Sequence, residues 1–412
     1  MHDAKPHVLL IAYHFPPAPE IGGLRPFRFR KYLQRAGYPC HVITASPQAE
    51  GCPADTVFIG DELKRLWDEG PRGRLSIEAW QELLIRKAVF PGHLGFVWSR
   101  KVAAQCRQII DQHPHDRFVL YSTYPPIGTL LAGLILRLRK PIPWIADFRD
   151  PILTGGAIPP LRMRLGNRAL EAATFRLASR VIANTEGAAN VWRKRYPSMQ
   201  RKLHVILNGF DPEDAPRPRE IPPRPNRLIV HAGALYHGRN PHVIIESLSR
   251  LRTRAVAEAL TAKVLLLGSI DQNSAIDPGL CRQAQQDGWL EMRPPVVRAE
   301  AQRLLEEADG LLLVQPHTNI QIPGKLFEYI CIGRPILALV PRLSAVEPIL
   351  KNAEVPHVCL YPDDDPHTVD AKLLAFLRLP SAPVAINNWF RDNFNATSQA
   401  EKLASLIDQV VV

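Results

Sequence analysis

Short runs of consecutive apolar residues alternate with longer amphipathic segments along the first half of the chain. The runs have the length of strands, and the segments between them have the spacing of helices with one apolar face. Strands that are apolar on both faces are typical of a parallel sheet covered by helices on either side. The predicted strands are residues 7–12, 40–44, 118–122, 144–147, 180–184 and 204–207, and the clearest helical segments are 25–36 and 127–138.

The same pattern restarts after a proline-rich segment. Residues 212–226 hold prolines and charges without a periodic apolar face, which is typical of a linker. Further strands are predicted at 228–232, 263–267, 310–314 and 335–339, with helices at 241–251, 299–308 and 325–332. The chain is therefore predicted to be α/β, with a first domain at 1–210, a linker at 211–227, a second domain at 228–387 and a helical end at 388–412. Two such units suggest a ligand cleft between them, because open parallel sheets bind ligands beyond the carboxyl ends of their strands.

Composition places the chain among folded soluble proteins. Its 412 residues are 46% hydrophobic and 22% charged, which excludes bulk disorder and collagen-like structure. No signal peptide is visible, and the longest apolar stretch, 127–136, is much shorter than the roughly 20 residues of a membrane-spanning helix. The six cysteines form no C-x-x-C pair, so neither a zinc site nor a disulfide framework is indicated, and we expect reduced, mostly buried thiols in the cytoplasm.

Charge is divided unequally along the chain. Residues 1–210 carry 30 basic and 16 acidic side chains, a net charge of +14, whereas residues 211–412 carry 21 and 24, a net charge of −3. A basic half suits an anionic partner such as nucleic acid, an acidic membrane leaflet or a phosphorylated substrate, and a merely soluble basic face is the alternative. Nucleic acid is the least favoured partner, because the basic residues follow no recognised nucleic-acid-binding pattern.

Three segments of the basic half mix basic residues with aromatic and apolar ones: 25–33, 79–90 and 96–101. The second and third have the tryptophan, phenylalanine and leucine content, together with Lys and Arg, of a helix that lies in a membrane interface. An amphipathic helix packed on a protein core shows the same pattern. Both interpretations stand on the sequence alone.

Residues 322–336 carry the most informative candidates for chemistry. Pro323 and Gly324 open a predicted helix, whose first-turn amides and positive dipole end can hold an anion. Lys325 adds a cation for the same anion, and Glu328 can accept hydrogen bonds from the two hydroxyls of a ribose. Phosphates with a ribose indicate a nucleotide, although Lys and Glu at a helix start also form routine exposed ion pairs.

The loop after the first predicted strand holds three further candidates. Gly22 and Gly23 suit a loop that lets the backbone approach a diphosphate or an acceptor closely, and a plain turn is the alternative. His14 is a candidate catalytic residue, but a lone histidine after a strand is more often structural.

Asp147 and Asp150 flank Arg149 just beyond another predicted strand, where the catalytic residues of such sheets collect. Either carboxylate is a candidate catalytic group that orients an acceptor hydroxyl or stabilises developing positive charge. An Asp–Arg–Asp ion-pair cluster that only fixes the loop is the alternative.

Several other motifs are discounted. Asp363–Asp365 is acidic like a metal-binding run, but it lies between prolines, which favours a solvated turn. Asn395–Thr397 fits a glycosylation acceptor, which has no use in a cytoplasmic chain. Neither a P-loop nor a G-x-S-x-G motif occurs, which argues against P-loop phosphoryl transfer and against a serine hydrolase.

Residues 322–336 resemble the signature region of family-4-type glycosyltransferases, which have the GT-B architecture of two facing Rossmann-like parallel α/β domains with a cleft between them. The resemblance extends over nearly the whole chain, in matching order and spacing. The other motifs are Tyr13–Pro17 with Gly22 and Gly23, Asp147–Pro151, Val181–Thr185, Asn208–Asp211, His231–Arg239 and Ala308–Asp309. Together they point to the family and leave the sugar open.

The resemblance implies roles for individual residues. Such enzymes bind a nucleotide-diphosphate sugar on the C-terminal domain, where Glu328 matches the glutamate that holds the ribose. Lys325, preceded by Gly324, falls in the phosphate-binding turn. Arg239 matches the usual position of the second phosphate-binding cation.

This sequence departs from the family at one position. The family's paired-glutamate motif has its first glutamate where this chain has Ile320. We therefore expect Asn319, Gln321 or backbone groups to take over the contact to the donor sugar.

The resemblance implies a cytoplasmic, bacterial-type glycosyltransferase that retains the anomeric configuration and needs no metal or other cofactor. We expect its acceptor to be a glycan or a polyprenyl-diphosphate-linked glycan at the inner face of the plasma membrane, in lipopolysaccharide, capsule or exopolysaccharide synthesis. An anionic membrane surface is then an expected partner of the basic half. A nucleotide-sugar epimerase or hydrolase on the same fold, or a binding protein with a degenerate site, are the alternatives. In this fold the last helix often crosses back to the first domain, as expected here for 388–412.

Overall fold

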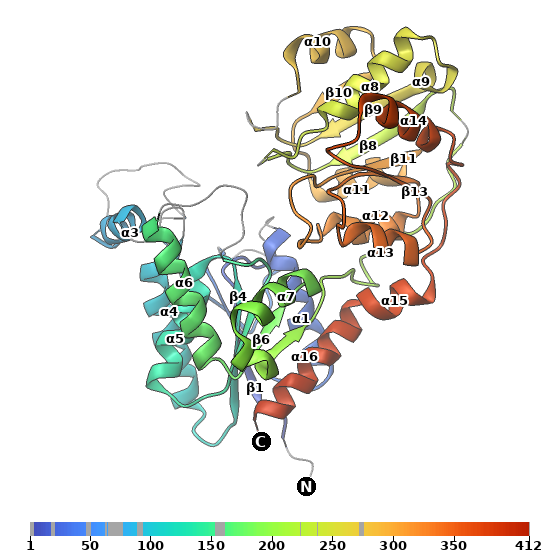
Figure 1. Ribbon diagram of the computed structural model, residues 1–412. Coiled ribbons are helices and arrows are strands. Elements are labelled where there is room, and N and C mark those ends of the chain that lie inside the picture. Colours follow the sequence, from blue (N-terminus) through green and yellow to red (C-terminus); the bar gives the residue numbers. More distant parts are fainter. Residues whose placement is uncertain are drawn as a thin grey trace. The chain divides into compact units, whose positions relative to one another are not determined.

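The computed structural model describes residues 4–17, 21–46, 51–61, 64, 77–88, 94–152, 161–222, 224–236, 238–271 and 276–411. The chain forms two compact units, each built around its own sheet (Figure 1). Unit 1 comprises Met1–Asn208 and Ala396–Val412, and unit 2 comprises Gly209–Asn395. Parallel strands with interleaved helices in both units confirm the predicted α/β class.

Unit 1 contains a seven-stranded sheet in which all neighbouring strands are parallel. The order across the sheet is β3-β2-β1-β4-β5-β6-β7, so the order reverses between β1 and β4. Open parallel sheets bind ligands beyond the carboxyl ends of the strands at such a reversal. The strands are β1 (His7–Ile11), β2 (Cys40–Thr44), β3 (Thr56–Phe58), β4 (Phe118–Tyr124), β5 (Trp144–Phe148), β6 (Arg180–Ala183) and β7 (Leu203–Val205).

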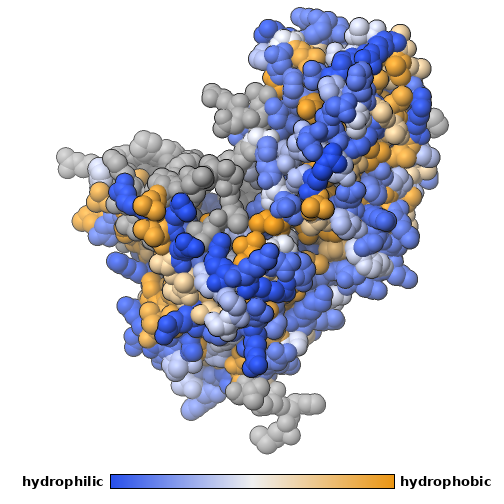
Figure 2. Space-filling view, in the orientation of Figure 1, coloured by the Kyte–Doolittle hydropathy of each residue, from blue (hydrophilic) through white to orange (hydrophobic). Residues whose placement is uncertain are grey.

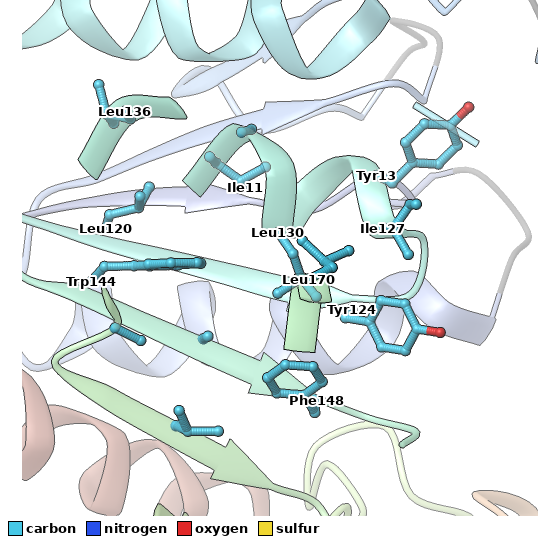
Figure 3. Packing of buried hydrophobic residues seen from close by; sticks show 14 of the residues in the cluster. Ile11, Tyr13, Leu120, Tyr124, Ile127, Leu130, Leu136, Trp144, Phe148 and Leu170 are labelled. Carbon is cyan, nitrogen blue, oxygen red and sulfur yellow. The ribbon is translucent and has the colours of Figure 1, made fainter. Parts of the chain in front are cut away.

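Helices cover both faces of this sheet. Because side chains alternate along a strand, Leu9 and Ile11 of β1 join one core cluster and Val8 and Leu10 join the other. The first cluster packs under α4 to α7 (Figure 3), and the second packs under α1 and α16. The helices are α1 (Leu24–Arg35), α3 (Ile77–Ala88), α4 (Phe96–Gln112), α5 (Ile127–Arg139), α6 (Leu161–Leu177), α7 (Glu186–Arg195) and α16 (Ala396–Val410), with short 3-10 helices at Ile21–Gly23 and Pro197–Lys202.

Unit 2 contains a six-stranded parallel sheet in the order β10-β9-β8-β11-β12-β13. The order reverses between β8 and β11. The strands are β8 (Arg227–Ala232), β9 (Ala262–Leu267), β10 (Leu290–Arg293), β11 (Gly310–Val314), β12 (Ile336–Leu339) and β13 (His357–Leu360). The helices are α8 (His242–Thr253), α9 (Ala257–Thr261), α10 (Pro278–Gln286), α11 (Arg298–Glu306), α12 (Lys325–Ile332), α13 (Val346–Asn352), α14 (Pro366–Leu377) and α15 (Asn388–Phe394).

The proline-rich segment that resembles a linker is counted within unit 2. The buried guanidinium of Arg334 donates to the backbone carbonyl of Arg219, inside this segment, and to that of Ser381. The C-terminal segment, predicted as one helix, is two helices separated at Asn395, where the backbone is extended. The first, α15, belongs to unit 2, and the second, α16, belongs to unit 1 and packs against α1.

The basic and aromatic segments differ in how they are used. Phe29 and Tyr32 of α1 are buried, and so are Phe96 and Trp98 of α4. Trp98 Nε1 also donates to the Ile59 carbonyl at 2.7 Å. The membrane-interface interpretation is therefore wrong for residues 96–101, whose aromatic side chains pack in the core, whereas Trp80 of α3 is exposed.

Two residues of the discounted acidic run, Asp363–Asp365, have structural roles. Asp365 caps α14 by accepting from the amides of His367 and Thr368. Asp364 has a buried side chain that pairs with Arg342 and Lys372 at 3.0 and 2.7 Å. The acidic run is thus a turn with Asp363 and Asp365 exposed, as predicted, and it also caps α14 and supplies an ion-pair cluster.

The cysteines behave as ordinary core residues. Cys40, Cys106 and Cys331 are buried, and the other three are half-buried. Burial raises the pKa of the Cys40 and Cys106 thiols to about 12. The described part of the chain contains no cluster of side chains suited to a metal ion, and none of its helices combines the length and the apolar character needed to span a membrane.

Candidate functional site

The residues predicted to bind a nucleotide gather at the carboxyl ends of β8 and β11 in unit 2. These two strands are neighbours where the strand order reverses, which is the usual ligand position in such sheets. The loop after β8 carries Arg239, and the loop after β11 leads to Gly324 and Lys325 at the start of α12. A Cβ at Gly324 would meet no atom within 4 Å, so the positive end of α12 is not closed off there.

Lys325 contacts a buried histidine of β8. Its ammonium donates to His231 Nε2 at 3.3 Å, and His231 Nδ1 donates to the Leu312 carbonyl at 2.8 Å. The carbonyl places the ring proton on Nδ1, so Nε2 offers its lone pair to the lysine. Burial and the charge of Lys325 lower the pKa of His231 to about 3, which keeps the ring neutral.

Lys325 and Arg239 form a pair of nearby cations. Burial and the Arg239 guanidinium lower the pKa of Lys325 to about 8. The Arg239 guanidinium stacks on the ring of Tyr236 at 4.3 Å. Within the described ranges, no carboxylate forms an ion pair with either cation. Glu328 attracts Lys325 only from beyond ion-pair distance. Two neighbouring cations without a close ion pair favour the binding of an anion.

Glycines permit the close approach of these groups. Gly233 has a positive φ of 121°, and a Cβ there would lie 2.7 Å from Lys325 Nζ. Gly238 has a φ of 76°, and its carbonyl accepts from His317 Nε2 at 2.5 Å. The hydrogen bond ties the loop after β8 to the loop after β11. The loop before Arg239 is thereby fixed beside Lys325 with no room for larger residues.

Glu328, the predicted ribose-binding residue, lies one turn beyond Lys325 on α12. Its Oε1 accepts from Arg298 of α11 at 2.7 Å, and its side chain is 32% exposed. On the buried side of the same turn, Tyr329 Oη accepts from the Ala232 amide at 3.2 Å, which joins α12 to the end of β8. Glu328 is thus held in a fixed position with an exposed edge that is available to hydroxyl groups.

Ile320, which stands where the family has its first glutamate, lies with its neighbours Asn319 and Gln321 in the loop between β11 and α12. Asn319 is exposed, and Ile320 and Gln321 are half-buried. The Ile320 amide donates to Thr318 Oγ1 at 3.4 Å. The structure places all three in the loop that leads to Lys325.

The Asp147 carboxylate in unit 1 is buried and surrounded by donors. Arg25 donates to its two oxygens at 2.8 and 3.0 Å, and Tyr121 Oη and Thr123 Oγ1 donate to Oδ2 at 2.5 and 3.3 Å. Arg25 also donates to the Ile206 carbonyl at 2.8 Å. Because the carboxylate is fully buried, this arrangement favours a structural ion pair over a catalytic role for Asp147.

Arg149 does not pair with Asp147 as the sequence alternative suggests. Its guanidinium donates instead to three backbone carbonyls, those of Gly22, Tyr124 and Pro125, at 2.5, 3.2 and 2.6 Å. Burial lowers its pKa. Arg149 therefore joins the loop after β1 to the loop after β4 at the strand-order reversal.

The remaining candidates of unit 1 lie near the same edge. A Cβ at Gly23 would lie 2.9 Å from the Phe15 backbone, so this position requires glycine. His14 is half-buried, with its ring edge-on to Tyr13 at 5.1 Å. Asp150 is half-buried and lies near Tyr124, whose pKa is raised by burial and by this carboxylate.

Sequence reasoning missed the partners of the candidate residues. His231 and Tyr329 behind Lys325, Arg298 beside Glu328, and Arg25 beneath Asp147 are contributed by other elements. A signal exists for His231, a polar residue inside an otherwise apolar strand. The sequence offers no comparable signal for Arg298, which looks like any exposed helical arginine.

Comparison with known proteins supports a specific family. Residues 27–214 match the model of Glycosyltransferase Family 4. No curated protein sequence matches the chain.

Solved structures with the same fold align over nearly the whole chain. HepE from Anabaena, in complex with UDP and glucose, has a TM-score of 0.59 and 12% identity, covering 98% of this chain and 100% of that one. The catalytic domain of starch synthase IV from Arabidopsis thaliana, bound to ADP and acarbose, has a TM-score of 0.64 and 12% identity, covering 99% of both chains. A Listeria monocytogenes protein provisionally assigned as a UDP-N-acetylglucosamine 2-epimerase has a TM-score of 0.52 and 12% identity, covering 98% and 96%.

At such identities these likenesses show the GT-B fold alone, which this chain shares with all three structures. The enzyme class comes from the family match in unit 1. Residues 27–214 thus match Glycosyltransferase Family 4 and the whole chain has the GT-B fold, and these two findings together support a glycosyltransferase.

Proposed function

We propose that this protein transfers a sugar from a nucleotide-diphosphate donor to a glycan or a polyprenyl-diphosphate-linked acceptor. The observation that carries the proposal is the pair of cations, Lys325 and Arg239, without a carboxylate ion pair in the described part of unit 2. Lys325 begins α12, Arg239 lies near enough to act on its charge, and Glu328 follows one turn later. Such a set matches the diphosphate and ribose of a nucleotide.

The proposed chemistry is stabilisation of the leaving diphosphate. Negative charge grows on the diphosphate as the bond to the sugar breaks, and fixed cations and helix-start amides stabilise that charge. His231 holds the Lys325 ammonium in position from behind. These groups supply positive charge from the protein itself, so the proposal includes no metal or other cofactor. Asn319, Gln321 or the backbone beside Ile320 would contact the donor sugar.

Unit 1 is proposed to bind the acceptor. Its sequence is strongly basic, which suits an anionic acceptor such as a polyprenyl diphosphate. Asp150 and His14 are the candidates for orienting the acceptor hydroxyl, near the loop formed by Gly22 and Gly23. Retention of the anomeric configuration, a role in cell-surface polysaccharide synthesis and action on the cytoplasmic face of the membrane are proposed from the family resemblance.

A thermal-shift panel of UDP-, GDP-, ADP-, dTDP- and CMP-sugars tests the donor site. We expect one nucleotide class to raise the Tm of the wild type and to lose this effect in Glu328→Ala. Glu258→Ala is the matched control, because Glu258 has the same 32% exposure and a 2.7 Å ion pair with Arg378 in the same unit. The proposal fails if no class stabilises the protein or if both variants lose the effect equally.

An epimerase is the second candidate, because the Listeria protein has the same fold. An epimerase would release an epimerised sugar from the donor with no acceptor present. Incubation of the stabilising donor alone, followed by product analysis, separates the two functions. Donor binding without turnover over a broad set of acceptors would instead favour a degenerate binding protein, to which the replacement at Ile320 would contribute.

A further inference from the structure

The helix α3 turns an apolar face outward. Ile77, Trp80 and Leu84 are spaced three and four residues apart, so they lie on one side of the helix. Their exposed fractions lie between 55% and 77%. The opposite side is anchored, because Ala79 is buried and Ile85 packs against the core of unit 1.

The first turns of α6 carry a second exposed apolar pair. Leu161 and Leu165 are spaced four residues apart and are 67% and 59% exposed. Exposed arginines lie around them, at Arg162, Arg164 and Arg168. No acidic residue occurs in α6 before Glu171, which is buried. The start of α6 therefore combines apolar and cationic side chains on one exposed surface.

These two helices belong to the same part of unit 1. Figure 1 shows α3 and the start of α6 at the same end of the unit, and Figure 2 shows apolar side chains gathered over that end among hydrophilic ones. We call Ile77, Trp80, Leu84, Leu161 and Leu165 the α3/α6 face. Single exposed apolar residues are common on soluble proteins, but five at one end of a unit mark an interaction surface.

We infer that the α3/α6 face binds the surface of an anionic lipid bilayer. Tryptophan and leucine side chains enter the boundary between head groups and acyl chains, while arginines beside them contact lipid phosphates. The exposed arginines at the start of α6, where no acidic residue precedes Glu171, complement an anionic surface, and this charge complementarity is the reason for assigning the face to a membrane. The inference rests on the proposed function for its purpose, which is access to a lipid-linked acceptor, but its test does not depend on that function.

Vesicle flotation at low salt tests the face. The probes are vesicles of phosphatidylcholine alone and vesicles that also contain phosphatidylglycerol. We expect the wild type to float with the anionic vesicles, and the double variant with Trp80→Glu and Leu84→Glu to lose about 10-fold or more in partitioning. The double variant with Leu161→Glu and Leu165→Glu should lose a similar amount, and a double variant with Arg162→Glu and Arg164→Glu should weaken binding to the anionic vesicles only.

Leu138→Glu is the matched control. Leu138 is 72% exposed and lies between Arg137 and Arg139, but it is at the C-terminal end of α5, which leads to the amino end of β5. It should leave flotation unchanged. Equal losses in the control and the face variants, or unchanged flotation in all of them, overturn the inference. A concentration-dependent dimer in light scattering that the face variants abolish, without vesicle binding, would assign the face to a second copy of the chain instead.

The same variants separate this inference from the proposed function. Face variants that keep the nucleotide-dependent rise in Tm but no longer float show an intact donor site and a damaged membrane face. If wild-type protein floats but no nucleotide stabilises it, the donor proposal fails and the membrane inference stands. If nucleotides stabilise the wild type but anionic vesicles do not retain it, only the membrane inference fails.

Discussion

The two units hold charged side chains near the carboxyl ends of their sheets in opposite ways. In unit 1, the Asp147 carboxylate is buried and accepts two hydrogen bonds from Arg25 and one each from Tyr121 and Thr123. In unit 2, Lys325 and Arg239 have a neutral histidine and an aromatic ring as neighbours, and no carboxylate ion pair within the residues described. A charge whose partners all lie inside the protein holds the fold together, whereas a cation without a close ion pair is available to a ligand.

Breaking the enclosed pair is expected to have the largest effect, and the effect is on stability. Asp147→Ala leaves the buried Arg25 guanidinium without its counter-ion, which typically costs about 3–5 kcal/mol. Urea unfolding followed by circular dichroism measures the loss. Nucleotide binding by the folded fraction should be unchanged, because the donor site lies in the other unit.

The matched control for Asp147→Ala is Asp111→Ala. Asp111 pairs with Lys140 at 2.8 Å, but its side chain is 49% exposed, so its removal should leave stability almost unchanged. An Asp147→Ala protein with wild-type stability and no transferase activity would contradict the comparison and return Asp147 to the list of catalytic residues.

Removing the Lys325 ammonium should affect activity rather than stability, the reverse of Asp147→Ala. Lys325→Met is expected to lower transferase activity about 100- to 1000-fold, as the loss of one group that stabilises developing negative charge commonly does. The free energy of unfolding should stay the same or rise, because a half-buried ammonium with a lowered pKa is replaced by an apolar side chain. Steady-state kinetics and urea unfolding measure the two quantities.

An exposed lysine of the same unit serves as the control for Lys325→Met. Lys263→Met, on β9, should change neither activity nor stability appreciably. If Lys325→Met instead destabilises the protein and keeps its activity, the lysine belongs to the fold and the assignment of unit 2 as the donor site is lost.

The histidine behind Lys325 gives the next largest effect, and it depends on pH. The pKa of His231 is about 3 in the folded protein, against about 6.5 for an ordinary histidine. Below pH 6.5 the unfolded chain therefore binds a proton that the folded chain does not, so stability falls as pH falls toward 3. His231→Phe should remove this dependence. Between pH 7 and pH 5, its free energy of unfolding should fall by about 2 kcal/mol less than that of the wild type.

Donor binding provides a second measurement on His231→Phe. Without the Nε2 lone pair, the Lys325 ammonium loses a hydrogen bond and its pKa should fall further below about 8. The pH above which nucleotide affinity declines should then shift downward, as titration calorimetry at several pH values would show. If nucleotide affinity and the free energy of unfolding depend on pH in His231→Phe as they do in the wild type, His231 contributes only packing.

The interior strands were predictable from the sequence, but of the four edge strands only β7 was predicted. The runs predicted at 263–267 and 310–314 match β9 and β11 closely, because strands covered on both faces are almost wholly apolar. The sequence prediction lacks β3, β10 and β13, all of which lie at sheet edges. Edge strands are short and carry polar residues, as in Leu290–Arg293, so they lack the continuous apolar run on which the prediction depends.

The residues of the candidate site were also only partly predictable from the sequence. Motif residues such as Lys325 and Glu328 can be picked from the sequence because they belong to one short helix. Their partners cannot, because His231 lies 94 residues away from Lys325 and Arg25 lies 122 residues away from Asp147. Which acidic residue is enclosed and which cation is left unpaired depends on these long-range contacts, so the sequence could not separate the structural Asp147 from a catalytic one.

A histidine cluster in unit 1 gives the smallest expected effect and tests whether acid sensitivity is special to unit 2. His7 Nδ1 lies 3.0 Å from His41 Nε2, and Asp116 Oδ2 lies 3.4 Å from both His7 Nε2 and His113 Nδ1. Burial and the neighbouring histidines lower the pKa of His7 and of His41, while Asp116 and Asp55 act in the opposite direction.

Since the folded-state pKa of His7 and His41 is lowered, unit 1 should also lose stability as pH falls below about 6.5, but by less than unit 2, because carboxylates partly offset the repulsion. His41→Gln should reduce this loss without affecting nucleotide binding. Hydrogen-exchange protection of the β1 and β2 amides at pH 7 and pH 5.5 reports on unit 1 alone. If His41→Gln leaves that protection as sensitive to pH as in the wild type, the cluster does not control the acid response of unit 1. The contrast between His231, which accepts a hydrogen bond from Lys325, and the mutually repelling histidines of unit 1 then no longer holds.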